Sequence, residues 1–192
     1  MAIPTAYCIN LDRRPDRWAR SREVFASNGI MVERFSATDG GYSETLRAGE
    51  VGILRTHKRL IAHAEELFLD AVTIFEDDVE LDLTHFVQYM AQVPNDWAFV
   101  YLGANHQRPI QHVSPNVARI VGSYALHAVI IRSSVYDAIL RELEEEVEPV
   151  DVTYARLHEQ YPAYVFRPHI AWQRPSYSDI LNTDVNYDWL KR

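Results

Sequence analysis

The sequence contains a single cysteine, Cys8, which lies in an apolar segment near the amino terminus. One cysteine cannot form an internal disulfide, and it cannot supply the several thiolates of a zinc or iron–sulfur site. The amino terminus shows neither a basic start nor a long apolar core, and no run reaches the roughly 18 apolar residues of a membrane span. These absences predict a cytoplasmic protein and leave peripheral contact with a membrane open.

Positive charge is also scarce. The sequence has 19 lysine and arginine residues and 27 aspartate and glutamate residues, which gives a formal net charge of −8. This balance gives no strong signal for nucleic-acid binding. The 192 residues are 47% hydrophobic and 24% charged, a composition typical of a globular domain that buries a core. Because the sequence lacks repeats, low-complexity tracts and linkers, we expect residues 1–192 to form one domain.

An apolar run, residues 71–75, ends in three consecutive carboxylates, Glu76, Asp77 and Asp78. The run predicts a short buried strand, and ligands of open α/β sheets bind at the carboxyl ends of strands. Adjacent acids repel one another unless a cation or hydrogen-bond donors compensate them, and Mg²⁺ and Mn²⁺ take oxygen ligands while keeping positions for phosphates. The triplet therefore indicates a metal and diphosphate site, with an exposed acidic turn as the alternative.

Apolar periodicity elsewhere predicts alternating strands and helices. We expect strands at residues 5–11, 30–35, 97–103 and 161–172, one or two strands within 118–131, and helices at 15–28, 50–69, 83–93, 133–147 and 154–160. Residues 105–116, with two prolines and two histidines, predict an irregular loop, and the tail from residue 173 shows no strong period. This order predicts an α/β fold with a Rossmann-like, mostly parallel central sheet flanked by helices.

Five separated segments resemble motifs of glycosyltransferase family 25, which includes bacterial lipooligosaccharide galactosyltransferases and collagen galactosyltransferase domains. In the order of the family, they are residues 9–17 (INLDRRPDR), 35–40 (FSATDG), 49–52 (GEVG) with Thr56-His57, 75–79 (FEDDV) and 149–151 (PVD). The resemblance covers most of the chain. It implies a GT-A fold and the inverting transfer of a hexose, galactose or glucose, from a UDP-sugar. The acceptor would be a glycan, as in lipopolysaccharide biosynthesis, a glycolipid or a modified protein.

The acidic motif of the family implies that Asp78 and Glu76 hold the cofactor, Mn²⁺ or Mg²⁺. A cation helps a nucleoside diphosphate to depart because it neutralises the charge that develops on the phosphates. Asp77 would face the ribose or stabilise the turn. His169, in the late strand, is a further candidate ligand of the metal.

The first two expected strands would supply the nucleoside side of the site. Their ends converge with Asp78 on one edge of a doubly wound sheet. Candidate contacts to uracil and ribose are Asn10, Leu11, Ala37, Asp39 and Gly40, and candidate contacts to phosphate are Arg13 and Arg17. The alternative for each arginine is an exposed helix face.

Transfer also needs a general base that takes a proton from the acceptor hydroxyl. Asp151 is the first candidate, and its alternative role is that of a helix N-cap. Asp179 is the second candidate, because the family often has a similar serine-aspartate-isoleucine segment. Glu50 and His57 are candidates for contacts to the donor sugar or the acceptor, with Glu50 also a candidate base, although a lone histidine is more often structural.

Two other classes of function compete with this hypothesis. A nucleotidyltransferase also uses strand-end carboxylates and a metal, but residues 10–17 lack the glycine and lysine of a typical phosphate loop. A non-catalytic domain that binds nucleotide or carbohydrate would keep the pocket and lack the base or the metal. Retention of Glu76, Asp77, Asp78 and Asp151 favours an enzyme.

Overall fold

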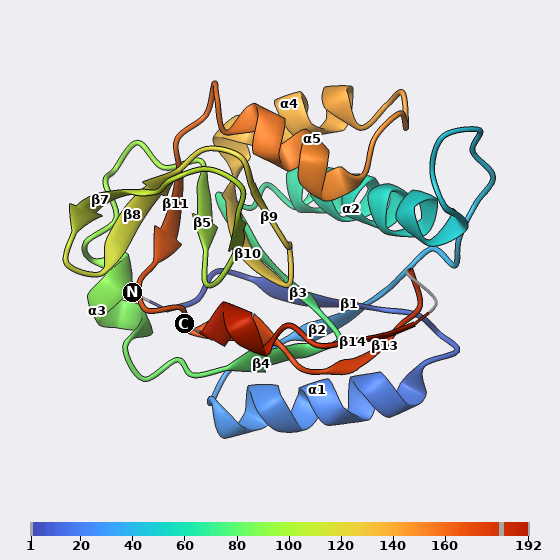
Figure 1. The fold of residues 1–192 in the computed structure, drawn as a ribbon, viewed down its shortest axis with the longest axis horizontal. Helices are drawn as coiled ribbons and strands as arrows, with labels where there is room; N and C mark the ends of the chain where they lie inside the picture. The colour runs from blue at the N-terminus through green and yellow to red at the C-terminus, as the bar shows by residue number, and fades with distance from the viewer. Residues whose placement is uncertain (1, 181–182, 192) are drawn as a thin grey trace.

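A mixed eight-stranded sheet forms the centre of the structure, a computed structural model that describes residues 2–180 and 183–191 (Figure 1). In spatial order its strands are β2 (Glu33–Ser36), β1 (Ala6–Asn10), β3 (Ala71–Glu76), β10 (Ala128–Arg132), β5 (Phe99–Tyr101), β11 (Ala163–Phe166), β8 (Val117–Ile120) and β7 (Gln111–Ser114). β10 and β8 run antiparallel to both of their neighbours, and the other strands of this sheet share one direction. The predicted α/β fold with a mostly parallel sheet is confirmed.

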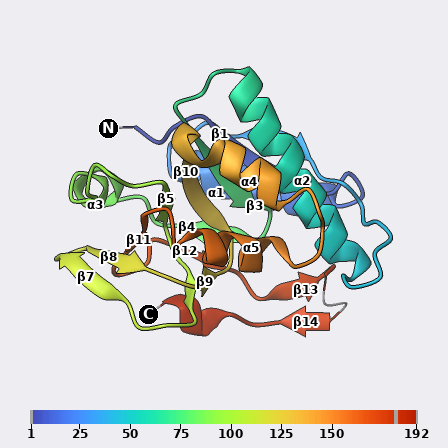
Figure 2. The same ribbon diagram turned by 90° about the horizontal axis from the view of Figure 1, so that it is seen from above.

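Helices cover both faces of the sheet (Figures 1 and 2). One face packs against α2 (Ala48–Glu66), α4 (Tyr136–Glu142) and α5 (Val150–Leu157), and the other packs against α1 (Pro15–Ser27) and α3 (Phe86–Met90). Successive strand residues point to opposite faces of the sheet. In β3, Val72 and Ile74 pack on the face covered by α2, α4 and α5, and Phe75 packs on the face covered by α1 and α3. Burial on both faces explains why the central strands read as continuous apolar runs.

The first strand and helix have simple local causes. All five residues of β1 are buried, which matches their apolar sequence. Pro15 occupies the first turn of α1, where its missing N–H costs nothing, and Gly29 follows the helix with a φ of 67° that favours glycine. These ends place the arginines of α1 next to the carboxyl end of β1.

Two predictions for the middle of the chain are wrong. Residues 105–116 do not form an irregular loop, because they contain β6 (Asn105–His106) and β7. Three strands lie in or beside residues 118–131, namely β8, β9 (Ser123–Tyr124) and β10, where one or two were expected. β6 pairs with β9, and β7 lies at the edge of the sheet. Such short strands at edges need no apolar alternation, so periodicity does not reveal them.

Several elements after the acidic triplet are also shorter or more numerous than the sequence predicts. The expected strand at 161–172 separates into β11 and β12 (Ala171–Gln173), and β12 pairs with β4 (Val79–Leu81) directly after the acidic triplet. The helices expected at 83–93 and 133–147 are the shorter α3 and α4, the latter preceded by the 3-10 turn η1 (Ser133–Val135). The tail forms the antiparallel pair β13 (Ser176–Ser178) and β14 (Thr183–Val185), followed by η2 (Asp188–Lys191) (Figure 2). In residues 2–180 and 183–191, no helix has the length and apolarity that a membrane crossing requires.

Close packing of α2 holds the loop after β2 in place. A Cβ atom at Gly52 would lie 2.5 Å from the carbonyl oxygen of Thr38 and 2.7 Å from the amide nitrogen of Gly40. The Thr38 N–H donates a hydrogen bond to the hydroxyl of Thr56, one turn further along α2 (2.9 Å). The expected glycine-containing loop therefore lies directly on the helix, and only a residue without a side chain fits between them.

Gly52→Ala is expected to lower the free energy of unfolding by about 1–3 kcal/mol, because the added methyl overpacks this contact. The direction of the change in stability is informative, because helix propensity alone would make the alanine variant more stable than the parent by about 1 kcal/mol. Urea unfolding of the variant and of Glu65→Ala, an exposed position in the same helix, measures the difference. A Gly52→Ala protein more stable than the parent would contradict this packing.

Candidate functional site

A cavity of about 510 Å³ opens where β1, β2 and β3 end. Its volume lies within the roughly 300–1,000 Å³ of small-molecule sites. The predicted site residues that line it are Asn10, Leu11, Arg13, Arg17, Ala37, Asp39, Gly40, Glu50, Glu76, Asp77, Asp78, Asp151 and Asp179. The structure therefore brings together residues that are up to 169 positions apart in the chain, from Asn10 to Asp179. His57 and His169 do not line this cavity.

Asp77 points away from its two acidic neighbours and organises the edge of the sheet. Its Oδ2 accepts a hydrogen bond from Asn10 Nδ2 (2.7 Å), and its Oδ1 accepts one from Arg17 Nη1 (2.9 Å). The hydroxyl of Ser21 donates to the Asp77 carbonyl (2.8 Å). Of the two roles expected for Asp77, these contacts match the structural one, since both carboxylate oxygens are already bound by the protein.

Asn10 has a similar organising role. Its amide nitrogen also donates to the Arg14 carbonyl (3.0 Å), and its Oδ1 accepts a hydrogen bond from Arg34 Nε (2.8 Å). The side chain is 1% exposed, and its polar atoms are bound by protein groups. Asn10 therefore joins the ends of β1, β2 and α1 around the cavity.

Glu76 and Asp78 differ from Asp77, because these half-buried side chains have few hydrogen-bond donors around them. In the part of the chain that the structure describes, the buried Oδ1 atom of Asp78 has no hydrogen-bond partner. Gln173 Nε2 approaches Glu76 Oε2 at 3.3 Å and Asp78 Oδ2 at 3.5 Å. Burial, followed by the charge of Asp77, raises the pKa of Asp78 to about 6. Burial, followed by the charges of Asp78 and Asp77, raises the pKa of Glu76 well above its usual range. The charge of Arg17, and for Asp78 also that of Arg174, opposes these increases in pKa without cancelling them.

The pair fits the coordination habits of Mg²⁺ and Mn²⁺. These ions bind through one or two carboxylates and take their other ligands from water and substrate phosphates. Within the described ranges, 2–180 and 183–191, no group of three or more His, Cys, Asp or Glu residues is arranged to hold a metal. A site built from two carboxylates therefore needs the phosphates of a substrate to complete it.

Three arginines from the start of α1 converge on Asp179. Arg13 Nη1 donates to its Oδ1 (2.6 Å), Arg14 Nη1 donates to its Oδ2 (2.5 Å), and Arg17 Nη2 lies 3.6 Å from the same oxygen. Arg13 also donates to Asp39 through Nε (2.9 Å). The Arg17 side chain is only 12% exposed, so the alternative of an exposed helix face is wrong for this residue.

The candidate bases differ in how their charge is compensated. Burial alone would raise the pKa of Asp179, but the hydrogen bond from Arg13 and the charges of Arg14, Arg17 and Arg13 bring it below the usual range. Burial raises the pKa of Asp151, against the opposing effect of nearby backbone N–H groups that include Ala125. A carboxylate with a raised pKa accepts a proton more readily, so the environment favours Asp151 over Asp179 as a base.

The helix context of Asp151 and Glu50 also separates these candidates. α5 begins at Val150 with Pro149 as its N-cap, so the expectation that Asp151 caps this helix is wrong. Asp151 lies inside the first turn and lines the cavity. Glu50 Oε2 accepts a hydrogen bond from the Arg47 N–H (2.8 Å) and so stabilises the start of α2. That contact commits one Glu50 oxygen to the helix end.

The two histidines expected in the site lie elsewhere. His57 is fully buried on the side of α2 that faces the core, and its Nδ1 lies 3.1 Å from the Tyr154 hydroxyl. It has no exposed surface with which to touch a sugar, so the expected contact is wrong. His169 lies between β11 and β12, with its ring centroid 5.5 Å from that of His106, and does not join Glu76 and Asp78 in a metal-binding group.

Several residues of the cavity were missed in the sequence. They include Gln173, Tyr124, Ala125 and Tyr187. Burial, and then the charges of Asp78, Glu76 and Asp151, raise the pKa of Tyr187, which shows that its phenol lies near all three acids. Gln173 and Tyr187 belong to the tail, whose lack of periodicity gives no signal. Asp151 could be predicted because it follows a proline-valine pair that resembles the family motif, whereas no motif includes Tyr124.

Comparison with known proteins gives two related sequences and no matching family model. A glycosyltransferase 25 family member of Drosophila pseudoobscura pseudoobscura is 31% identical over 104 residues, which is 43% of this chain and 17% of that protein. A glycosyltransferase 25 family member of Aedes aegypti is 27% identical over 131 residues, which is 54% of this chain and 21% of that protein. The chain is a relative of glycosyltransferase family 25. It spans about a fifth of the length of these two family members.

A solved structure supports the fold of this relative of family 25. The crystal structure of A197 from STIV aligns with a TM-score of 0.57 at 13% identity, over 91% of this chain and 87% of that one. At this identity the similarity concerns the fold alone. The sheet, with β10 antiparallel between β3 and β5, fits the GT-A type that the family resemblance implies.

Replacing Arg17 by methionine is expected to lower the free energy of unfolding by about 3–5 kcal/mol, because Asp77 would remain buried without its ionic partner. Arg20→Met is the matched control in the same helix: its side chain is 54% exposed and pairs with Glu23 and Glu80, so its loss should cost about 1 kcal/mol or less. Urea unfolding measures both. The double variant Arg17→Met with Asp77→Asn should lose less unfolding free energy than the sum of the losses in the two single variants. Additive losses would contradict the pairing.

Proposed function

We propose that this chain is a metal-dependent glycosyltransferase that moves a hexose, galactose or glucose, from a UDP-sugar to an acceptor hydroxyl with inversion. The observation that carries the proposal is the buried, unpartnered Oδ1 of Asp78, which lies with Glu76 in a cavity that arginines also line. The names of the two related proteins support the same class of reaction. The acceptor in this proposal belongs to a glycan, a glycolipid or a modified protein.

Glu76 and Asp78 would hold Mn²⁺ or Mg²⁺. When bound, the ion supplies positive charge that stabilises the departing diphosphate. Asp77 and Asn10 keep the two ligands aimed into the cavity through their own contacts with Arg17 and α1. Arg13 and Arg17 provide guanidinium groups at the same end of the cavity, and guanidinium forks suit phosphate oxygens.

The nucleoside side lies between the ends of β1 and β2. Leu11, Ala37 and Gly40 provide apolar or small surfaces for a planar base, and the Asp39 carboxylate can accept hydrogen bonds from ribose hydroxyls. Gly40 has a positive φ of 79°, a backbone conformation that favours glycine, and this allows the loop to turn there. Gly52 supports this loop from beneath.

Asp151 is the general base of the proposed reaction. Its carboxylate takes the proton of the acceptor hydroxyl while that oxygen forms a bond to the anomeric carbon. The bond from the anomeric carbon to the phosphate oxygen breaks, and its electron pair leaves with UDP. Because attack and departure occur on opposite faces of the sugar, one displacement inverts the configuration. The raised pKa of Asp151 makes its carboxylate a stronger proton acceptor than an exposed aspartate.

Asp78→Asn is expected to weaken UDP binding in the presence of Mn²⁺ by about tenfold or more, which corresponds to a loss of about 1.4 kcal/mol. The variant keeps the size of the side chain and removes the charge that holds the ion. Calorimetric titration of UDP with and without Mn²⁺ measures the effect, with Asp137→Asn in α4 as an exposed control away from the cavity. Equal UDP affinity in parent and variant at saturating Mn²⁺ would count against the metal site.

Asp151→Asn is expected to reduce turnover of the UDP-sugar by about 100-fold or more, the scale of general-base catalysis, while the dissociation constant of UDP stays unchanged. Hydrolysis of UDP-galactose and UDP-glucose measures turnover without knowledge of the acceptor, since water can take its place. Unchanged turnover would move the role of base to Asp179 or Glu50. A parent that binds UDP and turns over neither sugar would favour a non-catalytic binding domain.

A further inference from the structure

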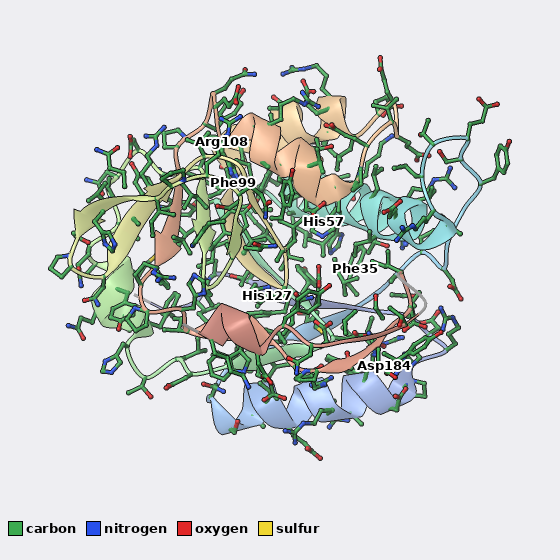
Figure 3. All side chains as sticks on the ribbon, viewed as in Figure 1. Phe35, His57, Phe99, Arg108, His127 and Asp184 are labelled. Atoms are coloured by element: carbon green, nitrogen blue, oxygen red, sulfur yellow. The ribbon has the colours of Figure 1, made fainter. Side chains whose placement is uncertain are left out.

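Two buried hydrogen bonds between tyrosine and histidine connect α5 to its neighbours. The Tyr154 hydroxyl, on α5, lies 3.1 Å from Nδ1 of His57 on α2. The Tyr101 hydroxyl, at the end of β5, lies 3.0 Å from Nε2 of His158, the residue that ends α5. All four side chains are 0% exposed. His57 is labelled in Figure 3 close to α2 and α5, and Phe99 packs against both Tyr154 and His158.

Each of these pairs also carries a cost for the stability of the core. Burial lowers the pKa of His57 and of His158 to about 3, so both rings are neutral. Among residues 2–180 and 183–191, His57 Nε2 and His158 Nδ1 each lack a hydrogen-bond partner. A buried polar atom without a partner costs about 1–3 kcal/mol, a cost that an apolar side chain of similar size would avoid. Their polarity therefore points to a role other than stability.

The hydrogen bond between His57 and Tyr154 joins α2 and α5, which lie on the same face of the sheet and both line the cavity. α2 contributes Gly49, Glu50 and Ile53 to the lining, and α5 contributes Val150 and Asp151. Tyr154 follows Asp151 by three residues, so the two side chains lie on neighbouring positions of one helix face. A contact that fixes Tyr154 against α2 also fixes the first turn of α5 and the carboxylate that it carries.

We propose that His57 and Tyr154 are positioning residues for Asp151. The hydrogen bond between them sets the distance from the Asp151 carboxylate to the donor sugar. This inference rests on the proposed function, in which Asp151 is the base. Proton transfer requires the base within about 2.6–3.2 Å of the acceptor oxygen. A displacement of about 1 Å at a reacting group reduces turnover on the order of 100-fold. Neither His57 nor Tyr154 lines the cavity, so both act through Asp151.

Tyr154→Phe tests this role because it removes the hydroxyl and keeps the ring. The expected result is a fall in kcat of about tenfold to 100-fold for hydrolysis of whichever of UDP-galactose and UDP-glucose the parent turns over. The dissociation constant of UDP with Mn²⁺ should stay unchanged. Tyr136→Phe is the matched control, because Tyr136 is also buried and its hydroxyl donates to a backbone carbonyl, that of Ile131 (3.4 Å), outside the cavity. The control should keep the parent kcat.

A second pair of variants tests the hydrogen bond from the other side. Asparagine can place a polar atom near the position of the His57 Nδ1, whereas leucine cannot. We therefore expect His57→Asn to keep a higher kcat than His57→Leu, with equal UDP affinity in both. Hydrogen exchange should accelerate at the amides of residues 151–153 in Tyr154→Phe and remain at the parent rate in Tyr136→Phe.

The outcomes separate this inference from the function on which it rests. An active parent whose kcat is unchanged in Tyr154→Phe and in His57→Leu would overturn the positioning role and leave the proposed function intact. A kcat loss of the same size in Tyr136→Phe would also overturn it, because the effect would then be general loosening of the core. A parent that hydrolyses neither UDP-sugar would overturn the proposed function, and the role of these two residues with it.

Discussion

The buried ion pair between Arg17 and Asp77 determines how the three consecutive acids divide their roles. Both side chains are about nine-tenths buried, with 12% and 10% exposed, and Asn10 and Ser21 bind the same aspartate from β1 and α1. Removing a charge from water costs several kcal/mol, so the pair is stable only while both partners remain in place. Because Arg17 is bound to Asp77, its charge compensates Glu76 and Asp78, which line the cavity, only in part.

The other end of the chain adjoins this pair and forms a further wall of the cavity. Asp179 binds Arg13 and Arg14, and a Cβ atom at Gly49 would lie 2.9 Å from the Cα of Ile180, so the tail packs directly on the first turn of α2. Gln173 reaches Glu76 and Asp78 from β12. The site therefore depends on contacts between segments that are more than 120 residues apart, since Gly49 and Ile180 differ by 131 positions. Through Asp179, the tail holds Arg13 beside this cavity.

Local patterns predicted the parts of the site that lie at the ends of apolar strands. β1 and β3 are short apolar runs followed at once by polar residues, so their ends and the acids at 76–78 could be placed from the sequence. β6 and β7 could not, because edge strands without an apolar face have no period to detect. The burial of His57 and the position of Tyr187 depend on packing between distant elements, which a residue-by-residue pattern does not contain.

The division of the site between two parts of the fold explains why the contact between α2 and α5 matters. The metal and nucleoside side is built on β1, β2 and β3, whereas Asp151 arrives on α5, about 75 residues after Glu76 in the chain, at positions 151 and 76. The sheet alone does not fix the distance between them, because α5 lies on the sheet as a separate layer. Apolar packing is non-directional and tolerates small shifts, whereas a hydrogen bond between two buried side chains specifies one geometry. The polar pair of His57 and Tyr154 gives that directionality to α5, the helix that carries the base.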